Sequence, residues 1–374
     1  MNIGFDAKRA FQNFTGLGNY SRTLLAELQT KYPQHQYHLY SPKIRRNART
    51  EPLFADGHFH HHSSQTLLKA WWRSRGVLKD LKRDQIDIFH GLSHELPFGI
   101  HKSEVKSVVT IHDLIFYPHP EQYGAWDRKV YHYKFRYACQ RADHIIAISE
   151  STKADILRYY GVAETKVTVI RQACNPIFYE EVSFGERSAV ASRWQLPQKY
   201  FLYVGSVIER KNMRLILQAL PQLVEDDPDF RLVVIGGGGS YYRQMQSMAV
   251  ALGLQAHIQW LTDIPFADFP AIYQNARAMV YPSYYEGFGL PVLEALASGL
   301  PAITSNRSSL PEAGGPASIY IDPDSVDELV AALRKLNQDS FDKAEMIRLG
   351  REYAETFRQG KQVQELMGIY EKLM

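Results

Sequence analysis

Two glutamates bracket a short glycine-bearing segment, Glu286-Gly-Phe-Gly-Leu-Pro-Val-Leu-Glu294. The apolar run Ala278–Tyr281 before it indicates the end of a buried strand, and Pro291–Ser298 predicts a helix with proline at its first position. A glycine turn between a strand and a helix presents backbone N–H groups and a positive dipole end to an anion. We expect Glu294 in the first helical turn, so both carboxylates would face one site for a phosphorylated, hydroxyl-rich ligand.

Two adjacent cations, Arg210 and Lys211, follow a second glycine turn. Gly205 ends the apolar run Tyr200–Val204, and the cations come just before the next helical pattern. Arginine offers a bidentate fork to phosphate and lysine offers a point charge, so the pair suits a diphosphate. An Arg-Lys pair is more often simply solvated. Its position after a strand, matched with the turn at Glu286, favours a functional interpretation.

Two features of the first half also follow predicted strands or precede helices. His112 and Asp113 end the apolar run Val108–Ile111, and Gly16 and Gly18 form a turn before a helical pattern. A histidine at a strand end can contact a sugar hydroxyl or a leaving phosphate, although such a histidine is more often a satisfied core residue. Alone, the two glycines indicate only a turn.

The elements that would position these residues alternate between strand and helix. The predicted strands are Asn2–Asp6, Gln36–Tyr40, Ile86–Phe89, Val108–Ile111, His144–Ile148, Lys166–Ile170, Tyr200–Val204, Arg231–Ile235, His257–Trp260, Ala278–Tyr281 and Pro301–Thr304. Short apolar strands separated by helices indicate parallel sheets covered on both faces. A chain of 374 residues also exceeds what one core usually supports, about 250–300 residues.

We therefore predict an α/β protein with two Rossmann-like, doubly wound domains. The first spans residues 1–173 and is joined by a C-terminal helix at about 357–374; the second spans 174–356. Ligands of such folds bind at the carboxyl ends of the strands. The candidate residues come from both halves, so we expect them to meet across a cleft between the domains.

The two halves differ in charge. Residues 1–173 contain 25 Lys and Arg but 16 Asp and Glu, although the formal net charge of the chain is only +3. The basic, aromatic stretches Leu67–Lys82 and Trp126–Tyr137 are compatible with helices that lie on an anionic membrane surface or cover a core. Neither a binding motif nor a strongly basic overall charge supports binding to nucleic acid.

Other features of the composition narrow the setting. Cys139 and Cys174 suggest neither a disulfide framework nor a metal motif and favour a reduced, cytoplasmic environment. No apolar window approaches the roughly 20 residues that span a bilayer, and the N-terminus predicts a strand rather than a signal peptide. The run His58-Phe-His-His-His62 invites a metal interpretation, but adjacent histidines point in different directions and the surroundings predict a loop.

The segments singled out above resemble those of one known family. The Glu286–Glu294 stretch is similar to the E-x7-E signature of retaining family-4 glycosyltransferases with the GT-B fold. The other matching segments, in the family's order, are Thr15-Gly-Leu-Gly-Asn-Tyr, Thr110-Ile-His-Asp113, Gly205 with Glu209-Arg-Lys-Asn, and Ser309-Leu-Pro-Glu312. The resemblance implies a hexosyltransferase that uses a nucleotide-sugar donor. Fixed cations and amides would stabilise the leaving group, with no metal and no other cofactor.

The resemblance also implies roles for individual residues. Glu286 would bind hydroxyls of the donor sugar, Glu294 the nucleotide ribose, and Arg210 and Lys211 the diphosphate. His112 would contact the sugar near its anomeric carbon and would complete the catalytic set with Glu286, Arg210 and Lys211. The full donor-binding set would be Gly16, Gly18, Gly205, Arg210, Lys211, Glu286, Gly287, Phe288, Gly289, Leu290 and Glu294.

A narrower resemblance concerns the donor. The stretch Ile170-Arg-Gln-Ala-Cys-Asn-Pro-Ile-Phe replaces the family's usual Val-Pro-Asn-Gly-Val and is similar to bacterial mannosyltransferases that build lipopolysaccharide O-chains, as is Phe89-His-Gly-Leu. This implies transfer of mannose from GDP-mannose to a glycan or lipid-linked glycan in cell-surface polysaccharide synthesis. We expect a cytoplasmic enzyme with peripheral contact to the inner membrane face through the basic N-terminal domain.

Several alternatives stay open. The same fold could transfer glucose or N-acetylglucosamine, or act as a nucleotide-sugar 2-epimerase, which would have no evident use for the E-x7-E stretch. A non-catalytic glycan-binding module is a third reading, and the intact Glu286, Glu294, Arg210 and Lys211 argue against it. The donor base, the acceptor, the linkage, the oligomeric state and the role of His58–His62 are not legible in the sequence.

Overall fold

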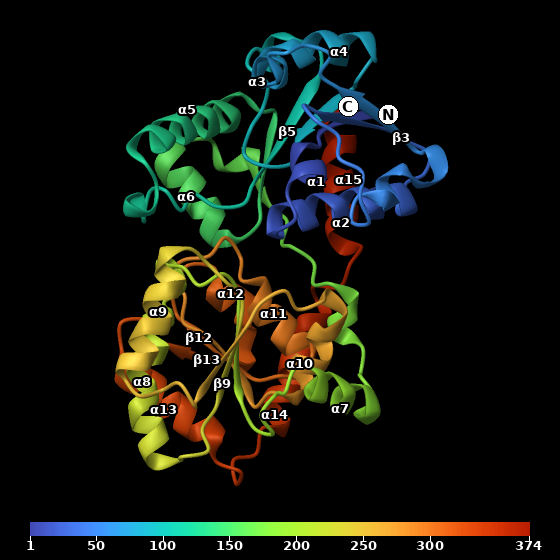
Figure 1. Cartoon of the computed structure of the whole chain (residues 1–374). Helices are drawn as coiled ribbons and strands as arrows, with labels where there is room; N and C mark the ends of the chain where they lie inside the picture. The colour runs from blue at the N-terminus through green and yellow to red at the C-terminus, as the bar shows by residue number, and fades with distance from the viewer. The chain divides into compact units, whose positions relative to one another are not determined.

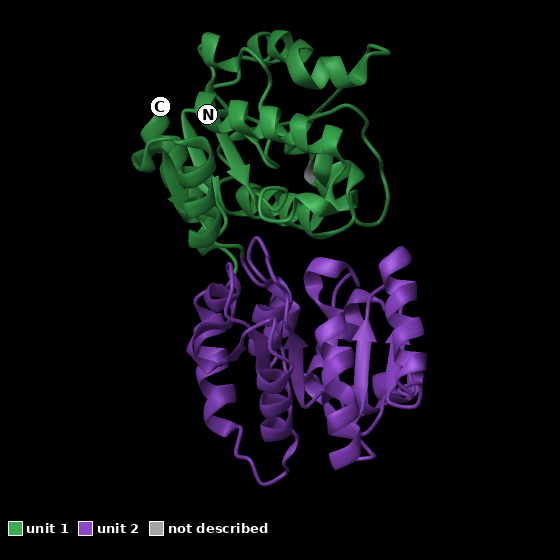
Figure 2. Cartoon of the chain, turned by 90° about the vertical axis from the view of Figure 1, so that its left-hand side faces the viewer, with its two compact units in different colours: residues 1–172, 359–374 green, residues 173–358 purple. Residues whose placement is uncertain are grey.

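The computed structural model describes residues 1–55 and 57–374, which form two compact units. Unit 1 comprises residues 1–172 and 359–374, and unit 2 comprises residues 173–358 (Figure 2). Each unit contains one parallel β-sheet flanked by helices (Figure 1). The predicted α/β architecture with two Rossmann-like units is confirmed.

Unit 1 is built on a seven-stranded parallel sheet in the order β3-β2-β1-β4-β5-β6-β7. Its strands are β1 (Asn2–Asp6), β2 (Gln36–Ser41), β3 (Phe59–Ser63), β4 (Ile88–Gly91), β5 (Lys106–Ile111), β6 (His144–Ala147) and β7 (Val167–Val169). The inner strands are buried on both faces, which explains why they read in the sequence as short continuous apolar runs.

Helices cover both faces of this sheet. They are α1 (Lys8–Gln12), α2 (Gly16–Lys31), α3 (Lys69–Trp71), α4 (Val77–Arg83), α5 (Ala125–Arg141), α6 (Glu150–Tyr160) and α15 (Lys361–Leu373). One hydrophobic core lies against α1, α2 and α15, and a second lies against α4, α5 and α6.

The C-terminal helix α15 is part of unit 1 although its sequence follows unit 2. The Tyr370 hydroxyl lies 2.6 Å from Nδ1 of His90 on β4, and both side chains are fully buried. At the start of the helix, the N–H of Gly360 donates to the Glu27 carboxylate over 2.9 Å. Buried apolar contacts and these hydrogen bonds together attach α15 to the sheet of unit 1.

The prediction that the histidine run lies in a loop was wrong. Residues 59–63 form β3, which pairs with β2 in parallel register. Successive side chains of a strand point to opposite faces. His61 therefore packs on Phe54 and Phe11, whereas His60 and His62 stack with His38 and Tyr40 on the other face. In β3, contacts between aromatic and histidine rings on both faces therefore replace the aliphatic packing that is usual for a strand.

Unit 2 is built on a six-stranded parallel sheet in the order β10-β9-β8-β11-β12-β13. Its strands are β8 (Phe201–Val204), β9 (Leu232–Ile235), β10 (Ile258–Leu261), β11 (Ala278–Tyr281), β12 (Ala302–Ser305) and β13 (Ile319–Ile321). Its helices are α7 (Phe184–Arg193), α8 (Met213–Asp226), α9 (Ser240–Ala251), α10 (Phe269–Asn275), α11 (Leu290–Ala297), α12 (Leu310–Gly314), α13 (Val326–Asn337) and α14 (Ala344–Glu355).

The two basic, aromatic stretches that are compatible with helices have different structures. The stretch Leu67–Lys82 contains α3, a π-helical turn at Trp72–Gly76 and α4, whereas Trp126–Tyr137 lies within the continuous helix α5. Among the described residues, no helix combines the length and the apolar character that crossing a bilayer requires.

Candidate functional site

The glycine turn before α11 is the centre of the candidate site in unit 2. Gly289 adopts φ +116° and forms the N-cap of α11, and a Cβ there would lie 2.9 Å from Leu310 Cδ2, so both the conformation and the space call for glycine. The helix begins at Leu290, one residue earlier than predicted. Glu294 therefore lies in the second helical turn and not, as expected, in the first.

The Glu286 carboxylate is held by a dense set of partners. Its Oε1 accepts hydrogen bonds from the Tyr281 hydroxyl and the Ser283 hydroxyl, each over 2.9 Å. Arg210 Nη1 lies 2.8 Å from the same oxygen, and Lys211 Nζ lies 3.9 Å away. The two cations and the carboxylate that sequence analysis placed on separate loops thus form one cluster.

Arg210 has a structural role besides its charge. Its guanidinium is 8% exposed and donates to the Tyr285 carbonyl, while its own carbonyl accepts from the Tyr284 N–H over 2.9 Å. These contacts join the loop after β8 to the loop after β11. Arg210 therefore orients the turn that carries Glu286.

Burial and charge act against each other in this cluster. Burial favours the neutral form of Glu286, but Lys211 and Arg210 outweigh it and hold the pKa of this carboxyl below its ordinary value. Burial lowers the pKa of Lys211, and the Glu286 carboxylate opposes that effect. An anionic ligand beside Lys211 would favour the ammonium form further.

Glycines let Lys211 lie close to the backbone. Gly205 adopts φ +144°, and a Cβ at this position would come within 2.8 Å of Lys211 Nζ. Gly236, after β9, adopts φ +139°, and its Cβ would lie 2.1 Å from the Gly205 carbonyl oxygen. Gly236, the first residue of the run Gly236–Gly239, must therefore be glycine because the loops after β8 and β9 lie in contact there.

Glu294 occupies a different electrostatic environment. The Tyr273 hydroxyl donates to its Oε2 over 3.1 Å. Burial raises the pKa of Glu294 to about 7, and Lys211 opposes the shift. Of the two signature glutamates, Glu286 is the strong anion and Glu294 is the one whose charge changes near neutral pH.

Serines from a later loop fix the backbone of the turn. The Ser308 and Ser309 hydroxyls each donate to the Glu286 carbonyl over 2.8 Å, and Ser309 also reaches the Phe288 carbonyl. The Phe288 ring is buried and packs 5.6 Å from the ring of Phe357, so any contribution of Phe288 to a ligand is through its backbone. Tyr281, Ser283 and Ser308 were not predicted from the sequence. Ser308 approaches from a separate loop and leaves no local signal, whereas Tyr281 and Ser283 lie only 5 and 3 residues before Glu286 and could have been considered.

In unit 1, Gly16 and Gly18 lie inside the first turn of α2, not in a turn before it. The helix starts early because Asn13 Oδ1 accepts from the N–H groups of Thr15 and Gly18. A Cβ at Gly18 would lie 1.8 Å from the Asn13 carbonyl oxygen, whereas one at Gly16 would meet nothing within 4 Å. Packing within unit 1 thus explains Gly18 and leaves Gly16 without a structural reason to be glycine.

His112 is buried at the end of β5, and both ring nitrogens have partners. Nε2 lies 2.9 Å from the Leu92 carbonyl, which can only accept, so Nε2 carries the proton. Nδ1 then accepts from the Gln172 amide over 3.3 Å. The Tyr20 ring of α2 stands edge-on to the imidazole at 4.7 Å, which brings the start of α2 beside His112.

Burial determines the charge state of His112. It lowers the pKa to about 3, and nearby His94 acts in the same direction. The imidazole is therefore neutral at physiological pH. It can form hydrogen bonds but is not an imidazolium that could act as a general acid. A ligand hydroxyl that reaches Nδ1 would replace the amide of Gln172.

The structure thus brings the predicted residues together within each unit. In unit 2, Arg210 and Lys211 contact Glu286, Gly205 lies against Lys211, and Glu294 is close enough to Lys211 to affect its pKa. In unit 1, the start of α2 and His112 are neighbours.

Comparison with known proteins places this geometry in a family. Residues 14–176 match Glycosyltransferase Family 4, and residues 186–353 match Glycosyl transferases group 1. O-antigen chain mannosyltransferase B of Escherichia coli is 34% identical over 264 residues, which cover 69% of this chain and 68% of that protein. O-antigen chain mannosyltransferase RfbU of Salmonella typhimurium is 27% identical over 231 residues, which cover 62% of this chain and 60% of that protein.

A solved structure supports the same assignment of fold. Anabaena Alr3699/HepE in complex with UDP and glucose superimposes with a TM-score of 0.76 and 15% identity, covering 100% of both chains. At this identity the likeness concerns the fold, two Rossmann-like units of the GT-B type. With matches over both units and a 34% identical relative, the chain belongs to the family-4 glycosyltransferases and is similar to bacterial O-antigen mannosyltransferases.

Proposed function

We propose that this glycosyltransferase transfers mannose from GDP-mannose to a glycan or lipid-linked glycan in the synthesis of an O-antigen-type polysaccharide. The cluster of Arg210, Lys211 and Glu286 on the turn before α11 is the observation that carries the proposal. The names of the two relatives, both O-antigen chain mannosyltransferases, favour mannose as the sugar.

The cluster suggests how the donor is held. Lys211 lies at 3.9 Å from Glu286, a loose contact that a diphosphate oxygen can replace, whereas Arg210 is held by several partners. Glu286 would then accept hydrogen bonds from hydroxyls of the sugar, and Glu294 from the ribose. Negative charge that develops on the leaving diphosphate is stabilised by a fixed cation in a partly buried site.

These positions also support a reaction without a metal ion. In other transferases a divalent cation neutralises the diphosphate. Here Lys211, Arg210 and the amides at the start of α11 would do so. No carboxylate besides Glu286 and Glu294 takes part in the proposed site. We infer retention of the anomeric configuration from the resemblance to the family.

Two measurements test the donor and the stereochemistry. GDP-mannose should raise the melting temperature more than UDP-glucose or UDP-N-acetylglucosamine, because a ligand at 100 times its Kd adds about 2.7 kcal/mol to the free energy of unfolding. Proton NMR of the product should show an α-mannoside from the α-linked donor. A larger rise in melting temperature with a UDP-sugar would contradict GDP-mannose as the donor. Epimerised donor in the absence of acceptor would show that the protein is an epimerase and contradict the proposed transfer.

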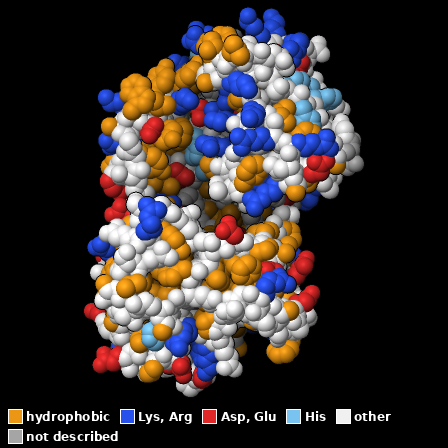
Figure 3. Space-filling view, in the orientation of Figure 1, with side chains coloured by type: hydrophobic (Ala, Val, Ile, Leu, Met, Phe, Trp, Pro, Cys, Tyr) orange, Lys and Arg blue, Asp and Glu red, His pale blue; other side chains and the backbone are white. Residues whose placement is uncertain are grey.

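We further propose that unit 1 contacts the inner membrane face. Leu67, Leu68 and Trp71 are 100%, 70% and 52% exposed, and Trp126 at the start of α5 is 76% exposed. Exposed lysines and arginines on α3, α4 and the turn between them accompany these residues. Figure 3 shows hydrophobic and basic side chains next to one another on unit 1. Such a mixture favours an anionic lipid surface.

A further inference from the structure

The outer part of the unit 1 sheet carries a row of aromatic rings outside the candidate donor site. In the register of β2 and β3, His38 pairs with His60 and Tyr40 pairs with His62. All four side chains lie on one face, with ring centroids 4.6 Å apart in the first pair and 4.5 Å apart in the second. The residue after α4, Asp84, reaches the same face, because the Tyr40 hydroxyl donates to its Oδ2 over 2.8 Å.

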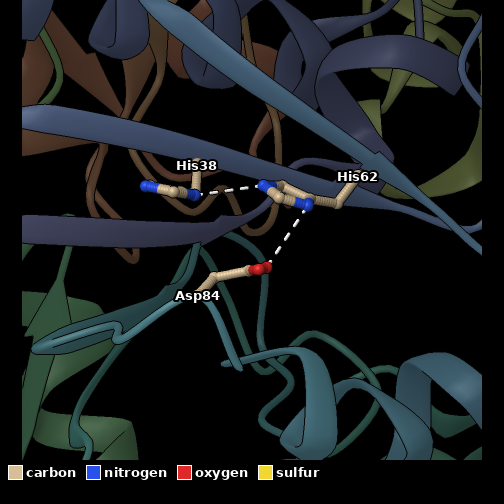
Figure 4. Close-up of side chains that lie close together, drawn as sticks. All are labelled: His38, His62 and Asp84. Carbon is tan, nitrogen blue, oxygen red and sulfur yellow. Dashed lines mark hydrogen bonds and ion pairs between the residues drawn. The ribbon is translucent and has the colours of Figure 1, made fainter. Parts of the chain in front are cut away.

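Two of the imidazoles face each other through their nitrogens (Figure 4). His38 Nδ1 lies 3.0 Å from His62 Nε2, and His62 Nδ1 lies 3.3 Å from Asp84 Oδ2. Within the described residues, each of these three side chains offers a possible ligand atom within 4.8 Å of the other two. Two strands and the end of a helix therefore converge on one point.

The carboxylate determines which nitrogen of His62 has a lone pair. Asp84 can only accept when ionised, so its carboxylate favours the proton on His62 Nδ1, the nitrogen that forms an ion pair with it. Nε2 is then an acceptor that points at His38. A carboxylate that orients a histidine in this way is the usual outer partner of a metal-bound imidazole.

The spacing is close to that of two nitrogens bound to one metal ion. Zinc binds imidazole nitrogen at about 2.0–2.1 Å, so two adjacent ligand nitrogens lie about 2.8–3.4 Å apart for bond angles between a right angle and the tetrahedral value. The observed separation of 3.0 Å lies in this range, and the ion would lie beside the line that joins the nitrogens, so both rings must rotate to aim their lone pairs at it.

Asp84 itself is already engaged. Besides Tyr40, Arg83 donates to both of its oxygens over 2.8 and 3.0 Å. A carboxylate with these partners is better placed to orient His62 than to bind the ion directly. His60 is turned away from the pair, because its Nε2 lies 3.0 Å from the Gln36 side-chain oxygen.

We propose that His38 Nδ1 and His62 Nε2 bind one divalent transition-metal ion, such as Zn²⁺, with Asp84 orienting His62 and water completing the coordination. When the ion binds, His38 gives up the proton on Nδ1 to solvent and takes up one on Nε2, so both imidazoles stay neutral and no net proton is released. Bound there, the ion ties the edge strand β3 to β2 and to the end of α4. The site is independent of the donor site and of the proposed reaction.

The test uses the full chain without a histidine tag, treated with chelator and titrated with ZnCl₂ by calorimetry. We expect one ion per chain and a rise in melting temperature with zinc. Asp84→Asn keeps both rings and should weaken binding about 10–100-fold. His62→Gln should abolish it, and His60→Gln, which alters the same face but neither ligand, should bind like the wild type.

A spectroscopic measurement distinguishes this site from scattered surface histidines. Electron paramagnetic resonance of the Cu²⁺-loaded protein should show coupling to two imidazole nitrogens in the wild type and in His60→Gln, and to fewer in His62→Gln. Zinc affinity that is absent in the wild type, or equal in wild type and His62→Gln, would overturn the proposal and leave a hydrogen-bonded histidine pair. Equal losses in His60→Gln and His62→Gln would also overturn it.

Discussion

Each signature residue has a distinct physical environment, although the sequence shows only its spacing. Glu286 is kept ionised by Lys211 and Arg210 in spite of burial, and Glu294 is not. The spacing of the two glutamates was enough to predict a shared site. The serine hydroxyls that hold the Glu286 carbonyl were not predictable, because Ser308 and Ser309 approach from a loop 22 and 23 residues away.

Glu294 should make unit 2 sensitive to pH. Its pKa in the folded chain is about 7, above the ordinary 4.5, so the folded state holds an extra proton between these values. The free energy of unfolding should therefore fall as the pH rises through this window, by at most about 1.4 kcal/mol per pH unit. Glu294→Gln removes this effect.

Calorimetric melting without ligand measures the prediction. The melting temperature of Glu294→Gln relative to the wild type should be higher at pH 7.5 than at pH 5. A difference that stays constant between these two pH values would show that Glu294 titrates normally in the folded chain.

The two glycines of α2 should respond differently to alanine. Gly18→Ala places a Cβ 1.8 Å from the Asn13 carbonyl oxygen and should destabilise unit 1. Gly16→Ala meets no neighbour, and alanine is the better helix former by about 1 kcal/mol, so the melting temperature should hold or rise. If the donor phosphate approaches this backbone, Gly16→Ala should still lower kcat/KM for the donor. Unchanged kcat/KM would remove Gly16 from the donor site.

At the scale of elements, most strands were predictable, and the edge strands β3 and β13 were not. The inner strands of both sheets were found within two or three residues, because burial on both faces makes them continuous apolar runs. β3 was missed because histidines take the place of aliphatic residues. α7 was missed although Ser183 and Glu186 form a capping box, a signal that was present in the sequence.

One of the hydrogen bonds that attach α15 to unit 1 is fully buried and can be removed by a single substitution. Tyr370→Phe deletes the hydroxyl that lies 2.6 Å from His90 Nδ1 and leaves that nitrogen without this partner in a buried site. An unsatisfied buried polar group costs about 1–3 kcal/mol. Amide hydrogen exchange should become faster in α15 relative to α2. Equal protection in wild type and variant would mean that apolar packing alone holds the helix.

The proposed membrane surface depends on charge as well as on apolar residues. Lys69→Ala, Lys79→Ala and Lys82→Ala together remove three exposed charges beside Trp71. At about 1 kcal/mol per charge, binding to vesicles with anionic phospholipid should weaken by roughly two orders of magnitude. Sedimentation of vesicles with and without anionic lipid measures this. Phe184→Ser, an exposed apolar residue of unit 2, is the matched control and should have no effect.

For the whole molecule, the sequence was sufficient to predict the family and the fold. It was not sufficient to predict which sugar is transferred. Five short segments in a fixed order identified the family, because four of them follow strand ends and the fifth begins helix α2. The choice between mannose and other hexoses depends on contacts to single hydroxyl groups. Such contacts would come from side chains on several loops, and no local sequence pattern encodes them.

The central claim is that Lys211, on the turn beside Glu286, binds the diphosphate of a nucleotide sugar. Calorimetric titration of GDP-mannose into the wild type and into Lys211→Ala tests it most directly, with Lys335→Ala, an exposed lysine on α13, as the control. The account predicts that Lys211→Ala binds GDP-mannose at least about tenfold more weakly, since a partly buried charge-assisted contact contributes about 1.5–3 kcal/mol. Equal affinity in the wild type, Lys211→Ala and Lys335→Ala would contradict it.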